Sequence, residues 1–197
     1  MDRDALKKRR LDYAHFSPDC SSFSKLARHC HGRKVTNAYM GTSAACQEGN
    51  KMLKKVCYTI EDQLDQNPNF IFTVENPDGN MQNQPLVKAL LEESTAGGGV
   101  GATKCIIDYC WFTEGETRFR KRTHFWTNSK ELIREFGPEN APRFMCTRQS
   151  PCPCFGPGGH KPVQGNSPEA TPFPPHLCEV IARLLSRELA AQRFRPL

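Results

Sequence analysis

The sequence has no long apolar run, no secretory signal and no internal repeat. None of its apolar stretches approaches the ~18 consecutive residues that a membrane span requires. The charged start of the chain lacks the apolar centre of a secretory signal, and no segment recurs along the chain. These absences predict a soluble, intracellular protein, without distinguishing nucleus from cytoplasm. A length of 197 residues predicts one ordinary hydrophobic core.

Positive charge and cysteine are what the composition offers instead. The formal net charge is +6, with Lys and Arg spread along the chain, which is compatible with a phosphate-bearing partner and is also ordinary for a soluble protein. The chain has ten cysteines. Because no secretory signal accompanies them, thiols kept for chemistry or for metal binding are favoured over a disulfide framework.

The first half of the chain has the pattern of a strand, a helix and a second strand. Leu11–Phe16 is a short apolar segment that ends at Ser17 and Pro18. A long amphipathic helix is predicted from Thr42 to about Gln66, with apolar residues mostly at four-residue steps: Ala45, Met52, Val56, Ile60 and Leu64. A second strand is predicted over Phe70–Val74, closed by Asn76 and Pro77. This order indicates a parallel crossover unit and an α/β fold.

The second half has two further predicted strands and one long helix. A short helix is predicted over Pro85–Ser94, and strands in Lys104–Phe112 and Arg122–Asn128. Gly137–Pro175 is rich in Pro, Gly and Cys and is predicted to be irregular. A helix follows Pro175, with one apolar side made of Leu177, Val180, Ile181, Leu184 and Leu185. We expect residues 1–136 to form the main α/β part of one domain, and residues 137–197 to complete it.

Cys20 and Glu75 each follow the end of a predicted strand. In open parallel sheets, ligands bind beyond the carboxyl ends of the strands. Because one crossover joins these two strands, the two side chains are predicted to share a site. A thiolate beside a carboxylic acid suits covalent catalysis, since the sulfur can add to an electrophilic carbon while the acid donates or holds a proton.

Three segments resemble motifs of the cytosine-5 DNA methyltransferases. "SPDCSSFS" (Ser17–Ser24) is similar to the nucleophile loop of that family, and "VENP" (Val74–Pro77) to its Glu-Asn-Val segment. "RFRKRTHFWTN" (Arg118–Asn128) is similar to the Gln-x-Arg-x-Arg segment. The resemblance is strongest to divergent members from phages and algae, and the order of the motifs agrees along the whole chain.

The resemblance implies a role for each matched residue. Cys20 would add to carbon 6 of a cytosine that is flipped out of DNA, and Glu75 would hold or protonate ring nitrogen 3. Arg120 and Arg122 would contact the base, its phosphate or the nucleophile loop. The residues that line the substrate loop would be Ser17, Pro18, Ser24 and Asn76. DNA would be the partner, and S-adenosylmethionine would supply the methyl group.

The resemblance also implies a partial fold. Family members carry a glycine-rich strand-to-helix turn, which binds S-adenosylmethionine, ahead of the nucleophile loop. Here only 19 residues precede Cys20. We therefore expect a partial doubly wound, Rossmann-like methyltransferase sheet with helices and an irregular C-terminal region. On this expectation the chain is the catalytic half of a methyltransferase, inactive without a supplied N-terminal half.

A zinc site is a separate prediction of the sequence. Cys146, Cys152, Cys154 and His160 lie within fifteen residues, and three thiolates with one imidazole can close a tetrahedral zinc site. Cys105 or Cys110 can replace one or two of these ligands, and free thiols in an irregular loop are the competing interpretation. With zinc, the alternative function is a zinc-stabilised nucleic-acid-binding module without catalysis.

A thiol hydrolase is a third class of protein that the residues leave open. Cys20 would then need a histidine base. His15 precedes Cys20, and His29 and His31 follow it, but none of the three has a spacing that identifies it as that base.

Overall fold

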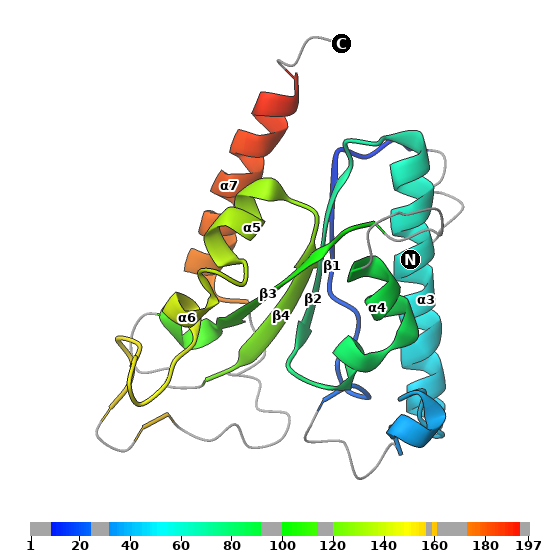
Figure 1. Ribbon diagram of the computed structural model, residues 1–197, viewed down its shortest axis with the longest axis horizontal. Helices are drawn as coiled ribbons and strands as arrows, with labels where there is room; N and C mark the ends of the chain where they lie inside the picture. Colours follow the sequence, from blue (N-terminus) through cyan, green and yellow to red (C-terminus); the bar gives the residue numbers. More distant parts are fainter. Residues whose placement is uncertain are drawn as a thin grey trace. The chain divides into compact units, whose positions relative to one another are not determined.

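The protein has a mixed α/β fold (Figure 1). A computed structural model describes residues 9–24, 32–91, 100–113, 120–156, 159–160 and 173–193. The elements in these ranges are, in chain order, β1 (Tyr13–Phe16), η1 (Val35–Asn37), α3 (Ala44–Gln66), β2 (Ile71–Pro77), η2 (Asn80–Asn83), α4 (Pro85–Leu91), β3 (Thr103–Asp108), η3 (Tyr109–Trp111), β4 (Arg122–Thr127), α5 (Lys130–Phe136), α6 (Ala141–Phe144) and α7 (Pro175–Arg193). The described strands form one mixed sheet in the order β1-β2-β4-β3. The predicted α/β class is confirmed.

The chain divides into two compact units. Unit 1 comprises Met1–Lys104 and Phe125–Asn128, and unit 2 comprises Cys105–His124 and Ser129–Leu197. The division falls within β3 and β4, so that each of these strands contributes residues to both units.

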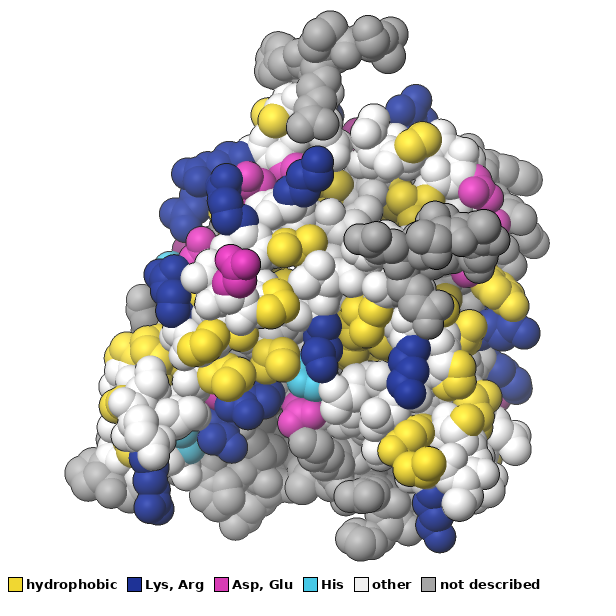
Figure 2. All heavy atoms as spheres, viewed as in Figure 1, with side chains coloured by type: hydrophobic (Ala, Val, Ile, Leu, Met, Phe, Trp, Pro, Cys, Tyr) yellow, Lys and Arg dark blue, Asp and Glu magenta, His cyan; other side chains and the backbone are white. Residues whose placement is uncertain are grey.

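The described surface carries charges of both signs. On the face shown in Figure 2, Lys and Arg side chains occur in several separate places, with Asp and Glu near some of them. No helix in the described ranges is long and apolar enough to cross a membrane.

The predicted parallel crossover is confirmed in unit 1. Strands β1 and β2 pair in parallel, with Tyr13 opposite Ile71 and Phe16 opposite Val74. Helix α3 lies between them in the sequence. Since parallel strands run in the same direction, the segments that leave β1 and β2 begin at the same edge of the sheet. This edge holds Cys20 and Glu75.

Helix α3 covers the predicted range, but its buried face differs in part from the prediction. The helix begins after Ser43, whose Oγ accepts a hydrogen bond from Cys46 N at 3.2 Å. Val56 and Ile60 are buried as predicted, whereas Ala45 and Met52 are exposed. A four-residue step turns about 40° beyond one full turn, so a run of such steps crosses the helix surface diagonally. The row of residues predicted to be buried therefore begins beside the buried face of α3 and reaches it only at Val56.

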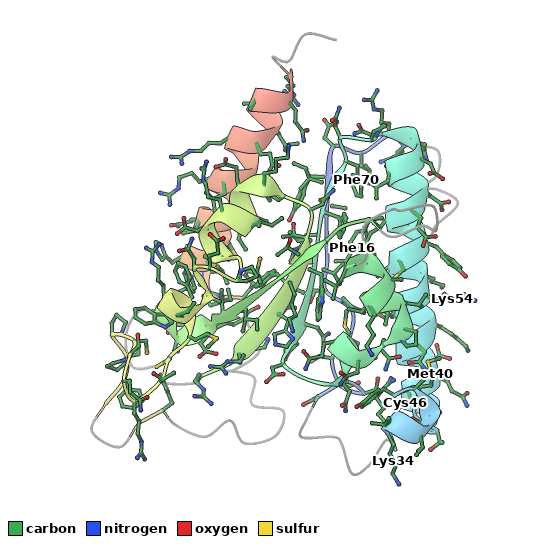
Figure 3. All side chains as sticks on the ribbon, in the orientation of Figure 1. Phe16, Lys34, Met40, Cys46, Lys54 and Phe70 are labelled. Carbon is green, nitrogen blue, oxygen red and sulfur yellow. The ribbon has the colours of Figure 1, made fainter. Side chains whose placement is uncertain are left out.

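Unit 1 has an aromatic and aliphatic core between the strands and helices α3 and α4. Phe16 and Phe70 are in this core, and Lys54, on the other side of α3, points outward (Figure 3). The other buried members are Phe23, Leu53, Val56, Cys57, Ile60, Phe72, Val74, Met81, Val87, Leu90, Ala102 and Trp126. Phe23 belongs to the loop that contains Cys20, so this loop is anchored in the core.

In unit 2, helices α5 and α7 lie side by side (Figure 1). The apolar side of α7 is confirmed, because Leu177, Ile181, Leu184 and Leu185 are buried. Glu188 of α7 accepts hydrogen bonds from Ser129 Oγ and from Lys130 N, the latter at 2.9 Å, so its carboxylate lies at the N-terminus of α5. The sequence reasoning did not predict α5.

Two of the predicted boundaries were wrong. The strand predicted over Lys104–Phe112 ends at Asp108, and a 3-10 turn follows, because Tyr109 N donates to Lys121 O and Phe112 N donates back to Tyr109 O. Within the segment predicted to be irregular, Ala141–Phe144 is a short helix. For Pro85–Ser94 the helix is confirmed to Leu91, and the last three residues lie outside the described ranges.

Candidate functional site

Hydrogen bonds join the loop after β1 to the last residues of β2 in unit 1. Ser17 Oγ donates to Glu75 Oε2 at 2.7 Å, and Asn76 Nδ2 donates to the carbonyl of Pro18 at 3.0 Å. Further along, Asn80 N donates to Phe23 O at 2.7 Å. Contacts between these parts of the chain therefore continue past the end of β1. They join the loop that contains Cys20 to Glu75 and to the residues that follow it.

Cys20 lies in a tight turn of this loop. Its carbonyl accepts hydrogen bonds from Phe23 N and Ser24 N at 3.0 and 2.9 Å. Asp19 fixes the start of the turn, because its carboxylate accepts from Ser21 N at 3.0 Å and from Ser21 Oγ at 2.6 Å. The Cys20 side chain is half-buried. The turn thus holds a partly accessible thiol on a constrained backbone.

Glu75 is a buried carboxyl group within β2, because this strand extends to Pro77 and does not end at Val74 as predicted, and 4% of its surface is exposed. Asn76 is fully buried, and its Oδ1 has no hydrogen-bond partner among the described residues.

His15, which precedes Cys20, contacts a threonine of β2: its Nδ1 and Thr73 Oγ1 are 2.6 Å apart. Burial lowers the pKa of His15, and the Glu75 carboxylate opposes this effect. The imidazole that precedes Cys20 is thus engaged with Thr73 through Nδ1, while His29 and His31 lie outside the described residues.

A buried arginine, Arg33, binds the Cys20 loop through hydrogen bonds and a ring contact. Arg33 is 1% exposed, and its Nε and Nη2 donate to Ser22 O and Ser22 Oγ at 2.8 and 2.9 Å. Its guanidinium carbon lies 4.1 Å from the centre of the Phe23 ring. Nη1 donates to Tyr39 O and Asn50 Oδ1, at 2.6 and 2.9 Å. Burial lowers the pKa of Arg33. The sequence reasoning missed this residue.

Two glycines let other backbone segments approach the same loop. A Cβ atom on Gly79 would lie 2.3 Å from the Phe23 carbonyl oxygen, and one on Gly49 would lie 2.5 Å from Ser22 Oγ. A Cβ on Gly79 would therefore displace the loop backbone, and one on Gly49 would displace the Ser22 side chain. Helix α3, which contains Gly49, and the segment after β2, which contains Gly79, thus both pack directly against the Cys20 loop.

The two arginines of the third motif belong to unit 2. Arg122 makes a two-pronged ion pair with Asp108, with Nε and Nη2 each 2.9 Å from a carboxylate oxygen. Asp108 is fully buried and also accepts from Cys146 N at 2.7 Å. Arg120 is exposed, and its Nη1 donates to Cys146 O at 3.3 Å. Both arginines are therefore linked to the peptide groups of Cys146.

Cys110, Cys146, Cys152 and His160 form a candidate metal centre in unit 2. Their ligand atoms all lie within 4.8 Å of one another. His160 Nε2 is 3.1 Å from Cys146 Sγ and 3.4 Å from Cys152 Sγ. The three cysteines are buried, and burial followed by the neighbouring Cys152 raises the pKa of Cys110. These four residues can hold a metal ion.

The structure brings together three of the four residues that the sequence predicted for zinc, with Cys110 as the fourth. Cys154 lies outside the group, because its Sγ donates to the Thr113 carbonyl at 3.2 Å. Cys105, the other predicted substitute, is buried, and its burial raises its pKa to about 12.

In unit 1, the predicted substrate-loop residues Ser17, Pro18 and Asn76 take part in the contacts described above. Ser24 pairs with Gly79.

Comparison of the chain with protein-family models, with curated proteins and with solved structures found no match.

Proposed function

We propose that unit 1 performs the covalent step of a reaction like that of the cytosine-5 DNA methyltransferases, in which the Cys20 thiolate adds to carbon 6 of a cytosine. The observation that carries this proposal is the pair of hydrogen bonds that joins the loop after β1 to the end of β2, from Ser17 to Glu75 and from Asn76 to Pro18. The parallel pairing through α3 also supports a Rossmann-like, doubly wound sheet as the finer description of the fold.

The proposed step balances in charge and in electrons. The sulfur of Cys20 forms a bond to carbon 6, and the electron pair of the 5,6 double bond moves toward carbon 5 and the ring. Glu75, in its protonated form, donates its proton to nitrogen 3, so the negative charge passes from the thiolate to the carboxylate. Ser17 Oγ donates to Glu75 Oε2 and orients the carboxyl group. Carbon 5 becomes a nucleophile that can accept a methyl group.

S-adenosylmethionine supplies the methyl group in the family that the sequence resembles. Its binding requires a glycine-rich turn from a strand to a helix N-terminus. In the described ranges, β1 leads into the glycine-free loop Ser17–Ser24, and β4 leads through Asn128 and Ser129 into α5. The described residues therefore do not fit this cofactor, and the proposal is limited to the covalent step. Arg120 and Arg122, which belong to unit 2, are proposed to contact DNA phosphate.

Covalent trapping on modified DNA tests the proposal without a methyl donor. The probe is a mixed-sequence DNA in which 2-pyrimidinone replaces cytosine, because the missing 4-amino group makes carbon 6 more electrophilic. We expect an adduct that survives a denaturing gel and maps to the peptide with Cys20. Cys20→Ser abolishes it, whereas Cys178→Ser, at an exposed thiol of α7, does not. Replacing Glu75 by Gln slows its formation by ~100-fold. An adduct that persists in Cys20→Ser contradicts the proposal.

A second candidate function is a metal-stabilised nucleic-acid-binding module without catalysis. The Cys110, Cys146, Cys152 and His160 group favours it, because this group links the loops of unit 2. Such a module binds DNA with an affinity that falls steeply with salt concentration, and it forms no adduct. Salt-dependent binding by wild type without trapping on 2-pyrimidinone DNA would favour this second function over the first.

A further inference from the structure

We propose that Cys110, Cys146, Cys152 and His160 bind one Zn²⁺ ion, and that this ion holds the Cys146 peptide in place. Arg120 contacts this peptide directly, and Arg122 is linked to it through Asp108. The metal site does not depend on the proposed covalent step, because all its residues belong to unit 2. Four ligand atoms from separate segments lie together here, and hydrogen bonds lead from the Cys146 peptide to both arginines.

The donor set fits tetrahedral zinc in number, type and spacing. Zn–S distances of about 2.3 Å and Zn–N distances of about 2.0 Å place ligand atoms roughly 3.5 to 3.8 Å apart in a tetrahedron. The four ligand atoms lie within 4.8 Å of one another, and the two sulfur to Nε2 distances are 3.1 and 3.4 Å. Small shifts are thus sufficient to close the site. Three sulfurs and one imidazole favour zinc over magnesium or calcium, which prefer oxygen ligands.

A hydrogen bond and an aromatic ring hold two of the four ligands, Cys146 and His160, in orientations suited to metal binding. Cys152 N donates to Cys146 Sγ at 3.2 Å, a bond that stabilises a thiolate. The Phe155 ring packs edge-on against His160, with the ring centres 5.4 Å apart, and so fixes the imidazole plane. Cys110 follows β3 in η3, whereas the other ligands lie after α6. The ion therefore joins a short turn at the end of the sheet to a segment with little regular structure.

The Cys146 peptide connects the ion to the arginines. Its N–H donates to Asp108, which also binds Arg122 through both carboxylate oxygens, and its carbonyl accepts from Arg120. A zinc ion with three thiolates and one imidazole carries one net negative charge. The positive charge of Arg120 beside Cys146 favours that state. Loss of the ion releases Cys146 and, with it, the support of both guanidinium groups.

Metal analysis of matched cysteine variants tests the ligand set. We expect about one zinc ion per wild-type chain by plasma mass spectrometry. Cys110→Ser loses it, while Cys154→Ser and Cys105→Ser retain it. Retention in Cys110→Ser together with loss in Cys154→Ser overturns the assignment. Wild-type protein that binds neither zinc nor Co²⁺ overturns the site itself.

Alkylation of the wild-type chain keeps the test valid if Cys110→Ser fails to fold. With Co²⁺ or Zn²⁺ bound, Cys110, Cys146 and Cys152 resist iodoacetamide, and a chelator makes all three react at least ~10-fold faster. The reactivity of Cys154 does not change. Equal acceleration at Cys154, or none at Cys110, overturns the proposed ligand set.

Hydrogen exchange at arginine side chains tests the link to Arg122. We expect chelation to speed exchange of Arg122 Nε–H, observed by NMR, by at least ~10-fold. The control is Arg33 Nε–H, which donates to Ser22 O in unit 1 and stays protected. Unchanged exchange at Arg122 after the metal is removed overturns the link. Equal acceleration at Arg33 also overturns it, because the effect is then global unfolding.

Discussion

Removal of Arg33 should release the Cys20 loop and destabilise unit 1. The guanidinium is almost fully buried, and the acceptors that it has among the described residues are all neutral oxygens: Ser22 O and Oγ, Tyr39 O, Met40 O, Cys46 O and Asn50 Oδ1. No carboxylate is among these acceptors. The residue therefore stabilises the loop through hydrogen-bond geometry and through its contact with the Phe23 ring.

The size of the effect follows from the acceptors that lose their donor. Tyr39 O and Met40 O also accept from Gln84 Nε2 and Asn50 Nδ2, so these two carbonyls keep a partner after Arg33→Ala. Ser22 O has no second donor in the part of the chain that the structure describes, and a buried unpaired carbonyl costs about 1–3 kcal/mol. The lost cation–π contact adds about 1–2 kcal/mol, and the cavity adds more. We expect Arg33→Ala to lower the free energy of unfolding by about 3–5 kcal/mol, a large share of a typical total of about 5–15 kcal/mol.

Urea denaturation and alkylation of Cys20 measure the two consequences. Arg33→Met is the matched control, because it fills most of the cavity but leaves Ser22 O unpaired, so we expect it to recover only part of the loss. In both variants, iodoacetamide should modify the Cys20 peptide faster, while the rate at Cys178 of unit 2 stays the same. A loss of less than 1 kcal/mol in Arg33→Ala, with unchanged Cys20 reactivity, would refute this account of the loop.

Three further outcomes follow from the described contacts. Gly79→Ala should lower the free energy of unfolding by about 2–4 kcal/mol in a urea melt, because its Cβ would lie 2.3 Å from Phe23 O. The control is the surface change Ala89→Gly on α4, which should cost about 1 kcal/mol. Native protein at pH 8 should leave Cys57 and Cys105 unmodified by iodoacetamide, since burial raises the pKa of each to about 12. Because these thiols have a higher pKa when folded, their contribution to stability is full below pH 9 and is lost as the pH rises toward 12; a flat thermal-melting profile over this range contradicts it. Asn76→Ala should cost about 1–3 kcal/mol in the same melts through the lost bond to Pro18 O, and no loss would mean that this bond does not hold the loop.

The sequence predicted the part of the site that depends on strand direction. A strand, a long helix and a second strand indicate parallel pairing, and parallel pairing brings the residues after both strands to one edge. The proximity of the Ser17–Ser24 loop to Glu75 follows from this, and it is confirmed. Helix α5 was missed because seven residues are too few for a periodic pattern, although Ser129 and Gly137 at its two ends are typical capping residues.

The parts that the sequence did not predict depend on tertiary contacts. Arg33 is a charged residue in a segment without periodicity, and nothing local distinguishes it from a solvated arginine. In the metal centre, Cys154 lies two residues from Cys152 and was the natural candidate, but its thiol bonds to Thr113 O. Cys110 occupies that position because β3 ends at Asp108 and η3 turns the thiol toward Cys146 and Cys152. The spacing of the cysteines along the chain does not predict this turn.

The pairing of Ser17 with Glu75 also sets the time at which the candidate site can form during folding. The two residues are 58 positions apart, and helix α3 and strand β2 are made after the Cys20 loop during synthesis. Helices form from local contacts, whereas parallel strands pair only after the intervening chain has closed. Helix α3 can therefore form early, and the Cys20 turn can gain its contacts with Asp19 and Arg33 before β2 is in place. The bonds from Ser17 to Glu75 and from Asn76 to Pro18 form only when β2 joins β1, so the Cys20 loop is joined to Glu75 only at that closure.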